Sequence, residues 1–144
     1  MTPECEFPKH NATSEQIRSI LKEAKTIAVV GLSPKEDRPS HSIALYLKDQ
    51  GYRVIGVNPG VSEIFGEKVY KSVAEIPDEI DIVDIFLRPE NIPPVVEDAI
   101  RKKAKVVWMQ LGIVNNAAAE SARAAGLKVV MNKCIFTEHR ALGL

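Results

Sequence analysis

Five residues in the segment 31–40 have the types and the spacing of an anion-binding loop. An apolar run at residues 26–30 precedes them. They are Gly31, Ser33, Lys35, Arg38 and Ser40. A glycine lets backbone N–H groups approach a ligand closely, hydroxyl groups donate hydrogen bonds, and Lys and Arg supply positive charge. A helix that starts near Ser40 adds unpaired N–H groups, so the chemistry that this segment predicts is phosphate binding.

Two common nucleotide-binding patterns are incomplete in this segment. The dinucleotide pattern G-x-G-x-x-G keeps only Gly31, since Ser33 stands at its second glycine, and the Gly-Lys-Ser/Thr ending of a P-loop is absent. NAD sites also carry Asp or Glu at the end of the second strand, where this chain has Asn58 and Pro59. A carboxylate there would repel a phosphate on the ribose, and its absence permits one. The residues thus suit a ligand with a pyrophosphate and a further phosphate, and NADP and coenzyme A (CoA) are both ligands of this kind.

Strands and helices alternate along the chain, and this order predicts the fold that positions these residues. Apolar runs predict strands at 26–30, 52–57, 80–87, 106–111 and 127–131, with a weak edge strand at 68–70. Periodicity and cap residues predict helices at 14–25, 40–51, 91–103, 115–125 and 134–142. The pattern indicates an α/β fold, a three-layer doubly wound parallel sheet with strand order 3-2-1-4-5-6 and the weak strand third. Residues 1–13 are expected to form an N-terminal arm, and residues 14–144 a single domain.

Polar groups together with Pro or Gly follow four of the predicted strands. The four segments are 31–34, 58–60, 87–89 and 110–112. Because parallel strands end at the same edge of a sheet, these loops are expected to meet there, and ligands of such sheets bind where the strand order reverses. The sequence therefore predicts a ligand groove that spans all four loops.

Five segments taken together resemble the family of small stand-alone CoA-binding proteins. They read GLSPK-x-x-RPS from Gly31, GYRVIGVNP from Gly51, IDIVDIFLRP from Ile80, VVWMQLGI from Val106 and GLKVVMNKC from Gly126. The resemblance covers residues 14–142. The fold of this family is similar to the CoA-binding domain of the succinyl-CoA synthetase α subunit. The resemblance thus implies a Rossmann-like CoA-binding domain with coenzyme A as its cofactor.

The resemblance also implies a role for each loop. The first loop would hold the CoA phosphates, the second would flank the adenosine, and the last two would line the rest of the groove. The implied cofactor-binding residues are Gly31, Leu32, Ser33, Lys35, Arg38, Pro39, Ser40, His41, Asn58, Pro59, Leu87, Arg88, Pro89, Gln110 and Gly112. The synthetase reacts through a phosphorylated histidine on a separate domain and needs a partner subunit. Since these 144 residues hold no such domain, no catalytic residue is assigned and a binding or regulatory module for CoA or an acyl-CoA is expected.

Other functions stay open at this point. The chain could be an NADP-dependent oxidoreductase, an acyl-CoA enzyme that needs a partner, or an interaction protein with a vestigial site. Cys134 is interpreted as a buried thiol, with a mixed disulfide to CoA as the alternative. Trp108 is interpreted as a core residue or a subunit contact, and a homodimer is considered. Asp84 interrupts an apolar strand and is interpreted as a buried hydrogen-bonding residue, because no second group for acid–base catalysis accompanies it.

Composition argues against several classes of protein. Nineteen basic and nineteen acidic residues give a net charge of zero, which disfavours a general nucleic-acid surface. No apolar run reaches membrane-spanning length, and the N-terminus is not that of a secretory signal. Two distant cysteines, Cys5 and Cys134, and three scattered histidines have no metal-ligand spacing. No metal and no membrane partner are expected, and the cytoplasm is the expected location.

Overall fold

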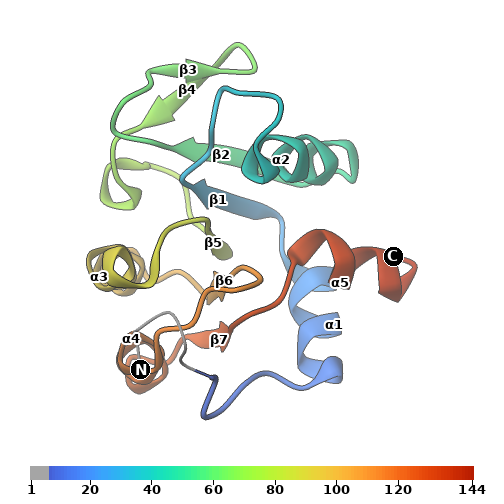
Figure 1. Ribbon diagram of the computed structural model, residues 1–144, viewed down its shortest axis with the longest axis vertical. Helices are drawn as coiled ribbons and strands as arrows, with labels where there is room; N and C mark the ends of the chain where they lie inside the picture. The colour runs from blue at the N-terminus through green and yellow to red at the C-terminus, as the bar shows by residue number, and fades with distance from the viewer. Residues whose placement is uncertain (1–6) are drawn as a thin grey trace.

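The computed structural model describes residues 7–144, which form one mixed sheet covered by helices. The strands are β1 (Thr26–Val30), β2 (Arg53–Val57), β3 (Glu63–Ile64), β4 (Glu67–Tyr70), β5 (Ile82–Ile85), β6 (Val106–Met109) and β7 (Lys128–Val130). The helices are α1 (Ser14–Glu23), α2 (Pro39–Asp49), α3 (Ile92–Arg101), α4 (Asn116–Ala124) and α5 (Ile135–Leu142), with 3₁₀ turns η2 (Val73–Glu75) and η3 (Pro89–Asn91). The strand order is β3-β4-β2-β1-β5-β6-β7 (Figure 1).

The predicted strand order is confirmed, with one addition at the edge. Strand β4 is the weak third strand of the prediction, and it pairs in parallel with β2. Strand β3 was not predicted; it pairs antiparallel with β4, so the sheet is not wholly parallel. The two residues between β3 and β4, Phe65 and Gly66, have φ of 59° and 72°. Two successive positive φ angles are typical of a tight hairpin turn, which explains how so short a strand can form.

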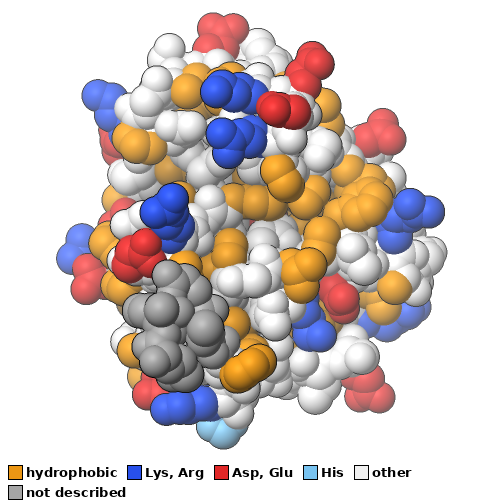
Figure 2. All heavy atoms as spheres, viewed as in Figure 1, with side chains coloured by type: hydrophobic (Ala, Val, Ile, Leu, Met, Phe, Trp, Pro, Cys, Tyr) orange, Lys and Arg blue, Asp and Glu red, His pale blue; other side chains and the backbone are white. Residues whose placement is uncertain are grey.

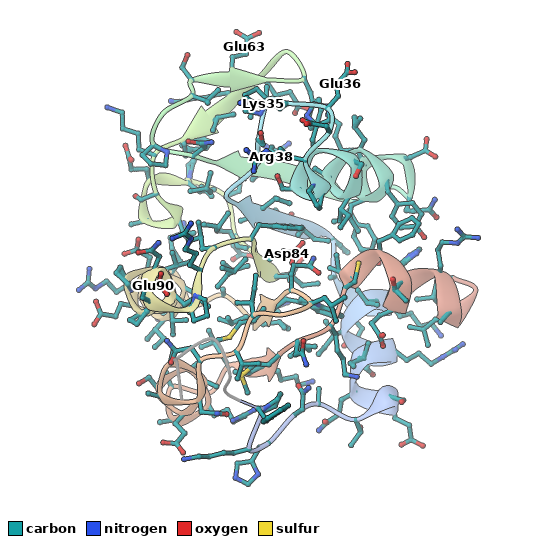
Figure 3. The ribbon with its side chains drawn as sticks, viewed as in Figure 1. Lys35, Glu36, Arg38, Glu63, Asp84 and Glu90 are labelled. Carbon is teal, nitrogen blue, oxygen red and sulfur yellow. The ribbon has the colours of Figure 1, made fainter. Side chains whose placement is uncertain are left out.

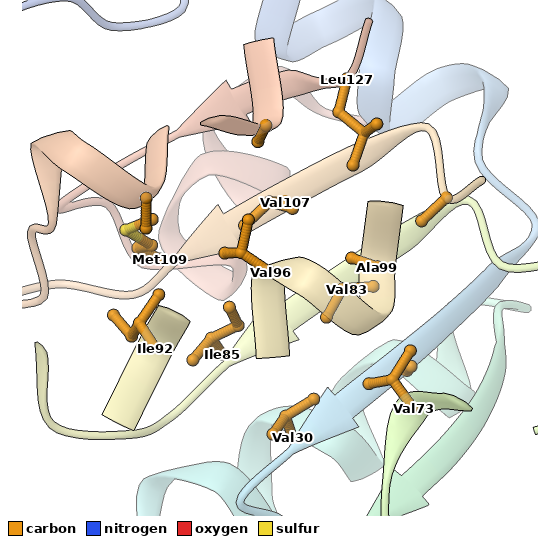
Figure 4. Packing of buried hydrophobic residues seen from close by; sticks show 14 of the residues in the cluster. Val30, Val73, Val83, Ile85, Ile92, Val96, Ala99, Val107, Met109 and Leu127 are labelled. Atoms are coloured by element: carbon orange, nitrogen blue, oxygen red, sulfur yellow. The ribbon is translucent and has the colours of Figure 1, made fainter. Parts of the chain in front are cut away.

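Helices cover both faces of the sheet. Figure 1 shows α3 and α4 on one face and α1, α2 and α5 on the other. The middle strands β1 and β5 lie between these layers and are almost wholly buried, as continuous apolar strands of a parallel sheet must be. On the first face α3 packs against β5 and β6 (Figure 4). The residues in that contact include Val83, Ile85, Ile92, Val96, Ala99, Val107 and Met109.

Trp108 belongs to the opposite face and is fully buried. Its Nε1 donates a hydrogen bond to the Lys133 carbonyl oxygen at 2.8 Å. Because the side chain is satisfied and inaccessible within one chain, Trp108 is a core residue and not a subunit contact. A homodimer stays a prediction, and Trp108 no longer supports it.

The described part of the predicted arm, residues 7–13, is held against the edge of the sheet at β7. The Asn11 amide donates to the Met131 carbonyl oxygen (2.8 Å) and accepts from the Met131 N–H (2.9 Å), as a neighbouring strand would. Arg123 donates to the His10 carbonyl oxygen. Cys5 lies outside the described residues. Within residues 7–144, no helix is long and apolar enough to cross a membrane, and no cluster of three or more His, Cys, Asp or Glu could hold a metal ion.

Candidate functional site

Gly31 forms the sharp turn at the end of β1, where the ends of three strands meet. Its φ is +88°, and its N–H donates to the Val57 carbonyl oxygen of β2 at 2.9 Å. A Cβ on this residue would lie 2.5 Å from the Phe86 carbonyl oxygen, just after β5. A side chain therefore does not fit at the point where the strand order reverses, and glycine is required for both its conformation and its size.

The loop from Gly31 to α2 is tied together by its own side chains. The Ser33 N–H donates to Ser40 Oγ (3.0 Å), and the Lys35 N–H donates to Ser33 Oγ (3.1 Å). The helix predicted at 40–51 starts one residue earlier, at Pro39. Ser40, which its residue type suggests as the N-cap, is not the cap, because Arg38 occupies that position. Proline suits that first position because its φ is already helical and its missing N–H costs nothing there. Arg38 makes no side-chain cap bond.

The buried His41 side chain also holds this loop in place. Its Nδ1 lies 2.9 Å from the Ser33 carbonyl oxygen, which can only accept, so Nδ1 carries the proton. The ring also packs edge-on against Phe65 of the β3–β4 turn, with centroids 4.8 Å apart. With the side chain 8% exposed, these contacts give His41 a role in positioning Ser33.

The main cavity of the carboxyl edge has a volume of about 650 Å³. Ten of the predicted site residues line it: Gly31, Ser33, Arg38, Pro39, Ser40, Leu87, Arg88, Pro89, Gln110 and Gly112. Five further residues were missed as lining residues, and most are apolar: Ile43, Phe86, Leu111, Ile113 and Cys134. Cys134 is half-buried rather than fully buried, and it borders this cavity. In Figure 2, hydrophobic side chains occupy the middle of the viewed face, with Lys and Arg above them.

A second cavity of about 410 Å³ adjoins the first, because Gly31 and Leu87 line both. Asn58 and Pro59, at the end of β2, belong to this second cavity. The Asn58 amide is also structural: Nδ2 donates to the Leu32 carbonyl oxygen and Oδ1 accepts from the Gly60 N–H, both at 2.9 Å. Four polar residues that had not been predicted also line it: Lys71, Ser72, Asn91 and Asp98.

Three predicted site residues line neither cavity. Leu32 is 2% exposed and packs over Gly56, where an added Cβ would come within 2.7 Å of Leu32 Cδ2. His41 is buried behind the loop as described above. Lys35 is exposed on the loop, with Glu36 at its outer end and Arg38 nearer to the sheet (Figure 3). Among the loop cations, Arg38 is thus the one that the structure brings to the groove.

Gln110 links the floor of the main cavity to a buried carboxyl group. Its Nε2 donates to Asp84 Oδ1 (2.9 Å), and its Oε1 accepts from the Ile135 N–H at the start of α5 (3.1 Å). Asp84 is fully buried, and its Oδ2 has no hydrogen-bond partner in the described part of the chain. Burial raises the pKa of Asp84 well above its usual range, against the smaller opposite effect of the Gln110 bond. Burial thus favours the protonated form of Asp84, and the bond between the two side chains holds Gln110 in its orientation.

The pH dependence of stability should reveal this proton. An unfolded Asp ionises above about pH 4, whereas the raised pKa lets folded Asp84 keep its proton to a higher pH. The contribution of Asp84 to stability should therefore fall as the pH rises above about 4. Asp84→Asn keeps an acceptor for Gln110 and removes the titration. Guanidinium unfolding at pH 4.5 and 7.5 and constant ionic strength measures this effect. The free energy of unfolding of the variant, relative to that of the wild type, should increase by up to ~1.4 kcal/mol per pH unit. An equal change in the free energy of unfolding between the two pH values for both proteins would contradict a raised pKa of Asp84.

Comparison with known proteins identifies the family. The profile of a CoA binding domain matches residues 25–140. The chain belongs to this CoA-binding domain family. Bacillus subtilis YneT is 41% identical over 90% of this chain and 96% of its own length. The structure of a hypothetical protein from Pyrococcus horikoshii superposes with a TM-score of 0.91, at 44% identity, covering 96% of this chain and 98% of that one.

Other proteins with similar sequences are much longer ligases. The α subunit of Pyrococcus furiosus ADP-forming acetate–CoA ligase I is 34% identical over 74% of this chain, which spans only 26% of that subunit. The Methanocaldococcus jannaschii ADP-forming acetate–CoA ligase is 29% identical over 77% of this chain, which spans 17% of it. The match is to the CoA-binding part of these ligases.

Proposed function

We propose that this protein binds CoA or an acyl-CoA along the carboxyl edge of its sheet and acts as a binding or regulatory module. One observation carries the proposal: in a chain of the CoA-binding domain family, two cavities that share Gly31 and Leu87 in their linings lie at the switch point. CoA is a long ligand with an adenosine at one end and a pantetheine arm at the other. Two adjoining cavities at this edge of the sheet support this assignment.

The chemistry of the lining supports one orientation of the ligand. The pyrophosphate would lie on the Gly31 loop, beside Arg38 and the first turn of α2, where positive charge and helix N–H groups favour an anion. The adenosine would occupy the second cavity beside Pro59. The pantetheine arm would run over the apolar part of the main cavity, toward Gln110.

Two enzymatic functions are the alternatives to this proposal. An NADP-dependent oxidoreductase would use the same edge of the same kind of sheet, and an acyl-CoA enzyme would need a partner for the parts that the longer ligases contain.

We assign the protein to the cytoplasm as part of the proposal, since the half-buried free thiol of Cys134 suits a reducing compartment.

Mass spectrometry of the denatured, freshly purified protein tests the proposal, together with calorimetry of the ligand-free protein. We expect the released small molecule to have the mass of CoA or a CoA thioester, and CoA to bind more tightly than NADP at matched salt. Tighter binding of NADP would overturn the choice of ligand, and no binding of CoA would support a vestigial site. Acyl-CoA turnover that appears only when cell extract is added would favour the partner-dependent enzyme.

A further inference from the structure

The second cavity contains a cation to which the proposed function has given no role. Lys71 is the first residue after β4, and its exposed side chain lines the cavity together with Asn58, Pro59 and Ser72. Backbone pairing fixes this neighbourhood, because the Asn58 N–H donates to the Tyr70 carbonyl oxygen at 2.9 Å. Lys71 forms no ion pair with any residue in the range 7–144. A lysine held beside a pocket without a carboxylate partner is available to an anionic ligand.

The other walls of this cavity determine where an anion can lie in it. Apolar side chains form much of the lining and suit a planar base: Val30, Val57, Pro59, Val73, Leu87, Pro94 and Val95. The only acidic residue in the lining is Asp98 of α3, which is paired with Arg101 at 3.9 Å. Since a carboxylate repels a phosphate, an anion in this cavity is favoured next to Lys71, at the end of β4, over the α3 side.

We infer that Lys71 binds the phosphate on the ribose of CoA and makes the site selective for CoA over 3′-dephospho-CoA. This inference rests on the proposed function and extends it. CoA carries two separate anionic groups, the pyrophosphate and the ribose 3′-phosphate, on either side of the ribose. Arg38 lines the main cavity and Lys71 the adjoining one, so each anionic group meets a cation of its own. An ammonium is suited to this task because it acts as a point charge that needs no fixed approach geometry.

Calorimetry with CoA and 3′-dephospho-CoA on three proteins tests the inference: wild type, Lys71→Met and the control Lys128→Met. Lys128 is also an exposed lysine, but it starts β7 at the opposite edge of the sheet, so its loss changes net charge without touching the groove. We expect the wild type and Lys128→Met to prefer CoA by roughly tenfold or more, the loss typical of a hydrogen bond to a charged group. Lys71→Met should bind the two ligands about equally. Lys71→Arg should keep most of the preference.

The outcomes separate this inference from the proposed function. If the wild type binds CoA and 3′-dephospho-CoA equally, or if Lys71→Met keeps the full preference for CoA, Lys71 does not read the ribose phosphate, whereas CoA binding itself stands. If the wild type binds neither ligand, both proposals fail. Affinity of Lys71→Met for 3′-dephospho-CoA equal to that of the wild type serves as the internal control for an intact cavity.

Discussion

Gly31→Ala is expected to lower the free energy of unfolding by about 2–5 kcal/mol, the largest stability loss that we predict. Alanine pays a penalty for the φ of +88°. Its Cβ would also lie 2.5 Å from the Phe86 carbonyl oxygen, and a backbone atom of a central strand end cannot move aside as a flexible side chain can. The displacement would separate β1 from β5, so CoA binding should be lost as well. Guanidinium unfolding and calorimetry measure the two effects.

Gly126→Ala is the matched control for this experiment. Gly126 has a similar φ of +93°, but apart from its two chain neighbours no residue comes within 4 Å of the position that a Cβ would take. This variant therefore loses only the stability that the backbone conformation costs, about 1–2 kcal/mol. If the two variants lose equal stability, the close approach of Phe86 to Gly31 contributes nothing and the argument for the switch-point glycine fails.

Signals that act over a few residues allowed much of the fold to be predicted. The apolar run at 26–30 marks β1 to the residue, because a strand covered on both faces tends to be a continuous apolar run. Asn115 or Asn116 is predicted from the sequence to cap the helix at 115–125, and the structure shows that Asn115 does so, since its Oδ1 accepts from the Ala118 N–H. Such features depend on neighbours along the chain, so the local order of residues reveals them.

The features that sequence reasoning missed depend on pairing between distant segments. Strand β3 has two residues, only one of which, Ile64, is buried, so no periodicity marks it. Lys71 comes close to Asn58 only through the register that pairs Val57 with Tyr70. The weak strand was predicted as the third strand of the sheet, but the residue that follows it, Lys71, was not included among the residues of the carboxyl edge.

Side-chain type also could not separate residues that face the groove from residues that hold it together. Ser33, Ser40 and Gln110 line the main cavity and are bonded within the protein. His41 has a comparable chemistry, yet its contacts are to Ser33 and Phe65 and it lines neither cavity. A polar residue type shows that a hydrogen bond will be made, and only the fold shows with what partner.

Arg38→Ala is expected to weaken CoA binding about tenfold or more, because a hydrogen bond to a charged group contributes roughly 1.5–3 kcal/mol. Arg38 lines the main cavity at the start of α2, and no ion pair within residues 7–144 occupies its guanidinium. Its charge is thus available to the pyrophosphate. The effect should shrink as salt is raised, since the contact is partly open to solvent. Calorimetry at two salt concentrations measures both the loss and its screening.

Two further variants make the result for Arg38 specific. Arg18→Ala removes the same charge from the exposed face of α1, away from both cavities, and should leave the affinity for CoA unchanged. Arg38→Lys should recover only part of the binding, because a single ammonium cannot make the two parallel bonds that a guanidinium makes to phosphate oxygens. Equal affinities for wild type and Arg38→Ala would place the pyrophosphate elsewhere. Equal losses in Arg38→Ala and Arg18→Ala would mean that net charge, and not the loop after β1, attracts the ligand.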